Sequence, residues 1–141
     1  MRLVLDTCVI VSAFRSRSGA SRGLLDQFDL GRYEILLSTA LLLEYEQVLL
    51  RPEQMEVHGF SAGEVAEVLN TLSARSSHVG LHFQWKPQLR DPNDELVLTV
   101  AINGRADAIV THNLADFLPA AHAFGISVLT PGRIMKERFC A

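Results

Sequence analysis

The chain has 141 residues, of which 48% are hydrophobic and 21% charged, and its formal net charge is −3. This length and apolar content predict one globular domain over residues 1–141 with a substantial core, and they exclude a disordered chain. The net acidity does not by itself indicate a nucleic-acid-binding protein. A metal-dependent enzyme can nevertheless be acidic, because bound divalent cations reverse the local field at a carboxylate cluster.

Charged residues also bear on the compartment of the protein. They interrupt every apolar run well before the roughly 18–20 residues that a membrane span needs, and Asp6 breaks the first run, so no signal peptide is expected. Cys8 and Cys140 lie near opposite ends of the chain without a CxxC spacing. This arrangement predicts neither a zinc site nor a disulfide framework. We expect a cytoplasmic protein with no membrane segment.

Short apolar runs alternate along the chain with segments of helical periodicity. In chain order, the predicted elements are a strand at 2–5, a short helix after Asp6, a helix at 20–31, a strand at 33–38, a helix at 38–51, a helix at 61–76, a strand at 78–83, a helix at 91–104, a strand at 107–111, a helical turn at 113–118, a strand at 126–130 and a helix at 130–139. The predicted N-caps are Ser38, Ser61, Asp91 and Thr130, and the predicted C-terminal stops are Gly31 and Gly104. Strands that are apolar on both faces and alternate with helices are typical of a parallel sheet covered on both sides.

Acidic and amide side chains are expected at one edge of this sheet, because sites form where parallel strands end, near a topological switch point. They follow separate elements of the chain: Asp6, Glu44, Asp91, Asp94, Asn113 and Asp116. Unpaired carboxylates in one place repel one another. Mg²⁺ or Mn²⁺ would compensate this repulsion, because both ions prefer carboxylate and water oxygens.

Helix capping is the alternative explanation for several of these residues. Asp6 precedes a helix, and Asp91 stands three residues before Asp94, the spacing of an N-cap and its partner. Because Pro92 occupies the first helical position, we assign capping rather than catalysis to Asp91. Asn113 and Asp116 show the same spacing.

Glu44 has a competitor on its own helix. At 100° per residue, Glu44 and Glu46 flank the apolar face of the 38–51 helix almost symmetrically. Periodicity therefore does not choose between them.

Four segments of the chain match a known family in order and spacing: "LVLDTCVIVSAF", "LSTALLLEYEQVLLR", "RDPNDELVLTVAINGRADAIVTHNLADF" and "ISVLTPGRIMKE". The chain resembles the PIN domain family and, within it, the toxin components of bacterial type II toxin–antitoxin systems (VapC-like ribonucleases). The resemblance implies a three-layer α/β/α sandwich with a central parallel sheet. It also implies an Mg²⁺- or Mn²⁺-dependent endoribonuclease that acts on RNA, forms a homodimer and is held inactive by a small cognate antitoxin.

The resemblance also implies roles for individual residues. Asp6 in "LDT", Glu44 in "LLxEY" and Asp94 match the catalytic and metal-binding acids of the family, which favours Glu44 over Glu46. The fourth acidic position of the family is Asn113 here, and Asp116 is expected to supply the missing carboxylate. Such a site would hydrolyse phosphodiester bonds with water, leaving 5′-phosphate and 3′-hydroxyl ends.

The residue at position 8 is the second departure, because Cys8 stands where the family usually has asparagine. It also argues against a rival function, a haloacid-dehalogenase-type phosphatase, which needs an aspartate there. A catalytically silent PIN module that binds RNA or a protein partner remains the alternative, and Asn113 is the reason for it. Metal-dependent RNA cleavage distinguishes this alternative from the enzyme.

Three arginines follow the first helix in a segment rich in serine and glycine: Arg15, Arg17 and Arg22. We expect them to lie beside the site and to contact RNA phosphates. Ordinary solvated surface charge is the alternative.

Overall fold

A parallel sheet forms the centre of the computed structural model, which describes residues 1–81 and 88–139. Its five strands are ordered β3-β2-β1-β4-β5, and every neighbouring pair is parallel. The strands are β1 (Arg2–Leu5), β2 (Glu34–Leu37), β3 (Ser77–His78), β4 (Ala108–Val110) and β5 (Ser127–Leu129). The centre of β1 has no exposed surface at Leu3, Val4 or Leu5, which explains why this strand is apolar without alternation.

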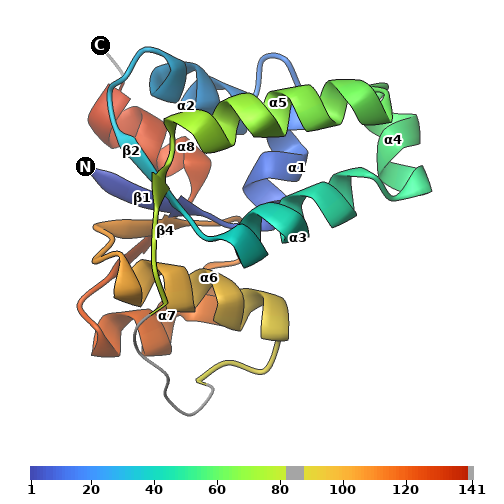
Figure 1. Cartoon of the computed structure of the whole chain (residues 1–141). Coiled ribbons are helices and arrows are strands. Elements are labelled where there is room, and N and C mark those ends of the chain that lie inside the picture. The colour runs from blue at the N-terminus through green and yellow to red at the C-terminus, as the bar shows by residue number, and fades with distance from the viewer. Residues whose placement is uncertain (82–87, 140–141) are drawn as a thin grey trace.

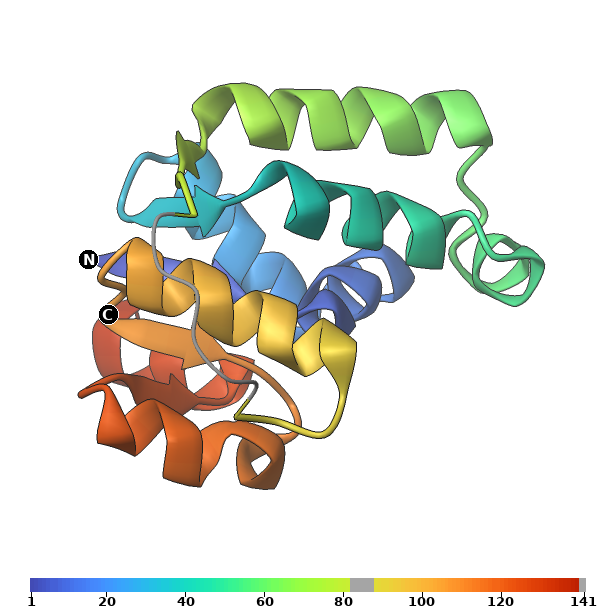
Figure 2. The same ribbon diagram turned by 60° about the horizontal axis from the view of Figure 1, so that its bottom comes forward.

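Helices cover both faces of the sheet. They are α1 (Thr7–Arg15), α2 (Ala20–Asp29), α3 (Thr39–Leu49), α4 (Pro52–His58), α5 (Ala62–Arg75), α6 (Pro92–Asn103), α7 (Leu114–Ala123) and α8 (Pro131–Ile134), which continues into the π-helical turn η1 (Met135–Phe139). Figures 1 and 2 show α6 and α7 on one face, and α1, α2 and α8 on the other. The predicted three-layer α/β/α sandwich is therefore confirmed.

The helices α3 and α5 pack side by side and are joined by α4 at one end of the molecule (Figure 2).

The predicted N-caps at the helix starts all form. Each side chain accepts a hydrogen bond from a backbone N–H of the first turn: Ser38 from Leu41, Ser61 from Glu64, Asp91 from Asn93 and Thr130 from Arg133. Glu64 completes a capping box at the predicted N-cap Ser61, because its side chain accepts a hydrogen bond from the Ser61 backbone N–H.

The order of the strands reverses beside β1. β1 pairs with β2 through Leu3 and Ile35, and with β4 through Leu5 and Val110. The chain runs from β3 at one edge across to β4, so the switch point of the sheet lies between β1 and β4. At this point the backbone N–H of Asp6 donates to the carbonyl oxygen of Val110 over 2.9 Å.

The helix α4 has no counterpart in the sequence prediction. α3 ends before Pro52 as predicted, but Pro52 then takes the first position of a new helix. This helix ends at Gly59, whose φ of 75° is the left-handed conformation that glycine adopts readily. Proline at the start and glycine just past the end form a recognisable helix signal, and both were present in the sequence.

Other boundaries also differ from the prediction. The third strand was predicted at 78–83, but β3 covers Ser77–His78 and residues 79–81 lie outside it, while 82–83 fall outside the described residues. As an edge strand it pairs with β2 alone. The last helix was predicted as continuous, and it changes to π geometry at Met135.

The helical turn predicted at 113–118 is longer in the structure and runs through Pro119 to Ala123. Phe117 and Ala121 are fully buried, so packing holds α7 together despite the proline. Gly104 follows α6 as predicted, but its φ is −87°. Its role is close packing, because a Cβ there would lie 2.8 Å from Leu36 Cδ1.

Cys8 is a free thiol, and Cys140 lies outside the described residues. Within the ranges that the structure covers, every helix is too short or too polar to cross a membrane.

Candidate active site

Asp6 lies directly after β1 at the switch point, with 7% of its surface exposed. Its side chain makes no capping hydrogen bond to α1. Instead, its Oδ2 atom accepts hydrogen bonds from Thr111 Oγ1 at 2.7 Å and from Cys8 Sγ at 3.3 Å. The carboxylate is thus directed toward the end of β4, and side-chain capping does not explain its position.

Thr111 is the residue that holds Asp6 in place. It follows β4, is fully buried, and accepts a hydrogen bond from the backbone N–H of Asn113 at 3.0 Å while donating to Asp6. The sequence prediction did not assign it a role. A polar residue directly after a buried strand was the available signal, because buried hydroxyls are nearly always hydrogen-bonded.

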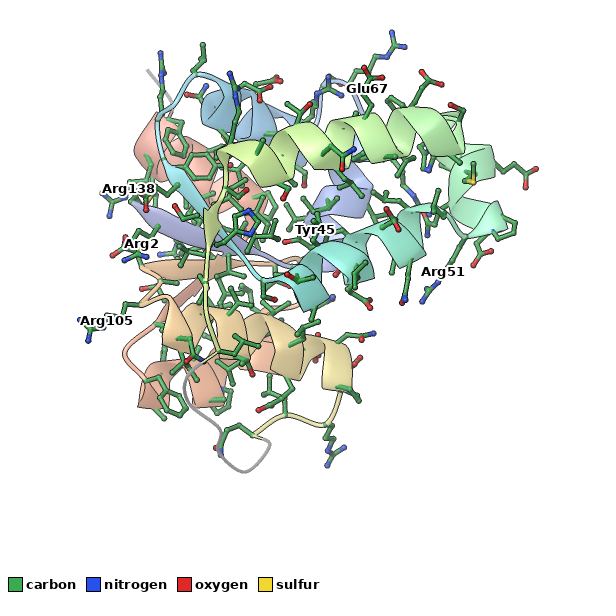
Figure 3. The ribbon with its side chains drawn as sticks, viewed as in Figure 1. Arg2, Tyr45, Arg51, Glu67, Arg105 and Arg138 are labelled. Atoms are coloured by element: carbon green, nitrogen blue, oxygen red, sulfur yellow. The ribbon has the colours of Figure 1, made fainter. Side chains whose placement is uncertain are left out.

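Tyr45 connects α3 to the same end of the sheet. Its ring is fully buried between α3 and β1 (Figure 3), and its hydroxyl donates to the carbonyl oxygen of Leu5. Burial, and then the charge of Asp6, raise the pKa of Tyr45 well above its usual value, so the phenol stays neutral. The contact fixes the helix that carries Glu44 beside β1.

Glu44 itself is half-buried on α3, which packs against α6. Within the described residues, no hydrogen bond or ion pair links Glu44 to Asp6 or Asp94. Successive helical residues point about 100° apart, so the fixed position of Tyr45 directs Glu44 away from the Leu5 carbonyl. The structure therefore places Glu44 on the helix that Tyr45 fixes beside β1.

Asp94 is electrostatically coupled to the other acids. Its pKa is raised to about 6, first by burial and then by the charges of Asp6, Asp91 and Asp116. Asp94 occupies the first turn of α6, where the helix dipole favours a negative charge. Burial and the three neighbouring carboxylates nevertheless raise its pKa.

Asp91 caps α6 as described, through a 2.8 Å hydrogen bond from the backbone N–H of Asn93 to its Oδ1 atom. It also lines a hollow of about 370 Å³ between α6 and α7, together with Arg90, Asp94 and Asp116. The structure thus brings Asp116 to the side of Asp94 that faces α7.

Asn113 is the N-cap residue of α7, yet its side chain makes no capping hydrogen bond. Asn113 and Asp116 are both exposed. Across residues 1–81 and 88–139, no group of three histidine, cysteine or acidic side chains lies close enough together to hold a metal ion. The predicted acids therefore share one end of the sheet without forming a compact ligand set.

Cys8 and His112 complete the surroundings of Asp6. Burial, and then the charge of Asp6, raise the pKa of the Cys8 thiol to about 11, so it is neutral at pH 7 and donates to Asp6. His112 is exposed, and Nε2 of its ring is hydrogen-bonded to Ser12 Oγ at 3.0 Å. Its backbone N–H donates to Cys8 Sγ at 3.5 Å.

The arginines of the predicted RNA-binding segment come together at the C-terminal end of α1. Arg15, Arg17 and Arg22 line one hollow of about 210 Å³ with His58 and Glu64. Asp6 precedes the opposite end of α1, which at 1.5 Å per residue is about 13 Å away. The three arginines thus lie one helix length from Asp6.

The five-stranded parallel sheet defines an α/β protein. The carboxylates of Asp6, Asp94 and Asp116, whose charges act on one another, form an acidic site near its switch point. A PIN domain model matches residues 2–115, and the chain belongs to the PIN domain family. No curated protein matches the chain.

The fold also resembles a solved structure. The crystal structure of VapBC2 from Rickettsia felis, bound to a DNA fragment from their promoter, superimposes with a TM-score of 0.59 at 15% sequence identity. The match covers 92% of this chain and 98% of that chain. At this identity the similarity concerns the fold alone.

Proposed function

We propose that this PIN domain is a metal-dependent endoribonuclease that hydrolyses RNA phosphodiester bonds and acts as the toxin of a toxin–antitoxin pair. The observation that carries the proposal is the nearly buried Asp6 carboxylate at the switch point of a PIN domain, held by Thr111 and Cys8. Its charge, with those of Asp91 and Asp116, contributes to the raised pKa of Asp94. No ion pair within the described residues compensates these carboxylates. Repulsion of this kind is expected where a cation binds.

The chemistry of the donors suits Mg²⁺ or Mn²⁺, because both ions bind carboxylate and amide oxygens. Binding would have to draw these side chains closer together, since the described residues do not form a compact ligand set. Asp6 and Asp94 would hold the ion together with Glu44, and Asn113 or Asp116 would complete the site. A divalent cation bound there would activate water as a nucleophile and stabilise the negative charge that develops on the phosphate.

The residues around Asp6 orient its carboxylate for this role. Thr111 and Cys8 both donate to Oδ2, which leaves Oδ1 as the oxygen directed at a ligand. Because the pKa of Asp94 is about 6, a fraction of the molecules carry a protonated Asp94 near neutral pH. A cation bound beside this carboxyl would lower its pKa and displace the proton. RNA cleavage at such a site would yield 5′-phosphate and 3′-hydroxyl ends.

The catalytically silent module remains the second candidate, because Asn113 places a neutral amide where the family usually has a carboxylate. One experiment separates the two functions. The protein is incubated with RNA in EDTA, Mg²⁺ and Mn²⁺, and its melting temperature is recorded in each. We expect cleavage and a higher melting temperature with metal, because a ligand of the native state stabilises it. Intact RNA and an unchanged melting temperature in all three would support the silent module.

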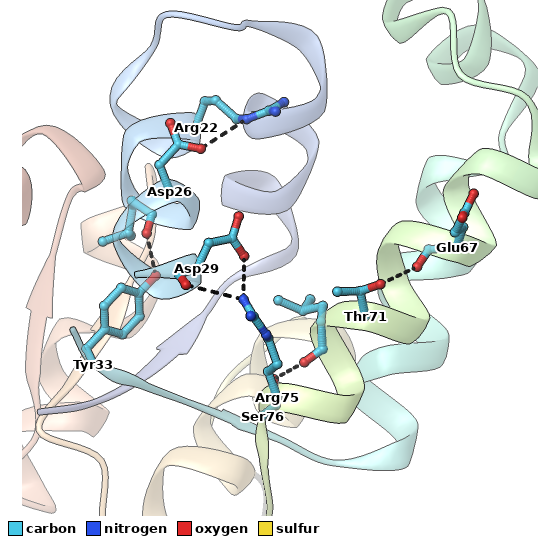
Figure 4. A network of polar contacts seen from close by, with 10 residues as sticks. Arg22, Asp26, Asp29, Tyr33, Glu67, Thr71, Arg75 and Ser76 are labelled. Carbon is cyan, nitrogen blue, oxygen red and sulfur yellow. Dashed lines mark hydrogen bonds and ion pairs between the residues drawn. The ribbon is translucent and has the colours of Figure 1, made fainter. Parts of the chain in front are cut away.

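An apolar groove supports the partner part of the proposal. A groove of about 360 Å³ lies between α1, α2 and α5, and its apolar lining includes Phe14, Phe28 and Phe60. Figure 4 shows α2 and α5 facing each other, with Arg75 donating to Asp29 at 3.4 Å across one end.

The polar residues along this groove are mostly acidic: Asp29, Glu64 and Glu67, against Arg22. An apolar floor with acidic sides suits an amphipathic helix that carries basic residues beside its apolar face. We assign this surface to a helix of the cognate antitoxin. The similar fold of VapBC2, a toxin–antitoxin complex, supports an antitoxin as the kind of partner, whereas its place in this groove and the homodimer stay predictions.

A further inference from the structure

A second hollow, of about 360 Å³, runs along α1 from Cys8 to Arg15. Its other walls come from Val48 at the end of α3, from Gln54 on α4 and from His112 after β4. From Cys8 to Arg15 the helix rises about 10 Å. The volume of the hollow falls at the small end of the usual range for ligand pockets. A space of this volume suits a single nucleoside.

The charge of this hollow differs from that of its neighbours. Its lining contains Arg15 and no carboxylate. The hollow beside Asp94 contains three carboxylates and Arg90, and the groove beside α5 contains three carboxylates and Arg22. The hollow that shares Arg15 with Arg17 and Arg22 contains Glu64. In a protein of net charge −3, this hollow suits a negatively charged ligand.

Arg15 is held in a fixed orientation at one end of the hollow. Its Nε and Nη2 atoms donate to Gln54 Oε1 at 3.1 and 2.9 Å. A guanidinium has five N–H donors, so this contact orients the group and leaves further donors for a ligand. A guanidinium plane that is already oriented loses less side-chain entropy when it binds a phosphate.

His112 is fixed at the other end. Its Nε2 atom is hydrogen-bonded to Ser12 Oγ at 3.0 Å and lies 3.4 Å from Ser21 Oγ. Ser21 is itself buried, with 4% of its surface exposed. An exposed ring held by two hydroxyls is a suitable surface on which an unpaired RNA base can stack.

The wall between these two ends combines apolar surface with a buried hydroxyl that has no hydrogen-bond partner among the described residues. Val11 and Val48 line the hollow and offer contacts to the face of a base. The Oγ1 atom of Thr7, in the same wall, is buried without a hydrogen-bond partner among the described residues. A buried hydroxyl without a partner is unusual in a native protein.

The hollow is joined directly to the candidate active site. Cys8 lines it, donates to Asp6 Oδ2 at 3.3 Å, and accepts from the backbone N–H of His112 at 3.5 Å. We propose that the hollow binds the nucleotide next to the scissile phosphodiester of single-stranded RNA, with the base against His112 and the following phosphate on Arg15. This inference rests on the proposed ribonuclease function and assigns to it a substrate-binding subsite.

The test measures binding of a fluorescein-labelled single-stranded RNA by anisotropy, in EDTA and in Ca²⁺, over a range of salt concentrations. The variants are Arg15→Ala and His112→Ala. Arg138→Ala is the matched control, because it removes the same charge from an exposed helix at the other end of the molecule from α4 (Figure 3).

We expect Arg15→Ala to raise Kd about tenfold, as for the loss of one charge-assisted hydrogen bond, and to reduce the salt slope by about 0.7. His112→Ala should raise Kd about five- to tenfold through lost stacking, without a change in slope. Arg138→Ala should change Kd by less than about twofold, as expected for a surface charge remote from the ligand.

The proposal is overturned if Arg15→Ala and His112→Ala bind as Arg138→Ala does, or if the parent binds no RNA in either buffer. Its failure is distinct from that of the ribonuclease proposal. If the two variants bind as expected but the parent leaves RNA intact with Mg²⁺ and Mn²⁺, the subsite stands and the nuclease does not. If RNA is cleaved and both variants keep the parental KM, the nuclease stands and the subsite does not.

Discussion

The hydroxyl of Thr111 donates a 2.7 Å hydrogen bond to the carboxylate of Asp6, from a position 105 residues further along the chain. The bond joins the ends of β1 and β4 at the switch point of the sheet. It fixes Oδ2 of the nearly buried Asp6 carboxylate. The orientation of Asp6 therefore depends on Thr111, which is not among the proposed metal ligands.

Replacing Thr111 by valine should destabilise the protein and reduce RNA cleavage. Valine fills a similar volume but removes the donor, and a hydrogen bond to a charged group contributes about 1.5–3 kcal/mol. Urea unfolding and a cleavage assay measure the two effects. Thr111→Ser keeps the hydroxyl and should retain most of the stability and activity. Equal stability and turnover in Thr111→Val and the parent would show that the bond has no part in placing Asp6.

Asp6→Asn should remove catalysis without unfolding the protein. We expect at least about a hundredfold less RNA cleavage, the scale on which the loss of one preorganised electrostatic contact is felt. In EDTA the variant should be no less stable than the parent, because a neutral amide relieves repulsion with Asp94. Asp91→Asn is the matched control: asparagine also caps helices, so cleavage should be nearly unchanged. Normal cleavage by Asp6→Asn would remove Asp6 from the site.

Asp94 should make the metal-free protein less stable as the pH rises. Its pKa is raised from 3.8 to about 6 in the native state, so the native state binds the proton more tightly than the unfolded chain. The favourable contribution of Asp94 is therefore present below pH 3.8 and is lost as the pH rises through about 6. Asp94→Asn should flatten this fall relative to the parent, measured by urea unfolding in EDTA at several pH values. Parallel curves for the two proteins would contradict the assignment.

The same shift predicts how metal affinity depends on pH. A cation competes with the proton on Asp94, so Mg²⁺ or Mn²⁺ should bind more tightly above pH 6 and release a proton on binding near that pH. Calorimetry in two buffers of different ionisation enthalpy measures the released proton. Binding without proton release across this range would indicate that Asp94 is not a ligand.

Val68 tests the groove between α2 and α5. Val68 lines this groove and is 39% exposed, so Val68→Arg should fold normally while repelling a basic partner helix. We expect loss of binding to the product of a small reading frame beside the gene, measured by calorimetry with the purified partner. Val57→Arg on α4 is the control, because Val57 is 58% exposed and lies outside the groove. Equal binding by both variants would place the partner elsewhere.

Local signals in the sequence were sufficient for most helices and strands. The N-caps Ser38, Ser61, Asp91 and Thr130 all form, because a cap needs only a side chain and a backbone N–H two or three residues away. The apolar run of β1 also predicted a buried parallel strand, since burial on both faces leaves no room for polar alternation. The signal for α4 is equally local, with Pro52 at its start and Gly59 just past its end, but the sequence prediction did not include this helix.

Contacts between distant residues were decided by the tertiary structure. The sequence alone determined that Asp6, Asp94 and Asp116 would lie near one edge of the sheet, since parallel strands end together. Only the folded chain shows that Asp6 turns toward Thr111 rather than toward α1, and that the charges of Asp6, Asp91 and Asp116 act on Asp94. The pairing register of β1 with β4 and the packing of α3 against β1 through Tyr45 set these relationships. Both depend on burial across the whole sheet, which no short stretch of sequence contains.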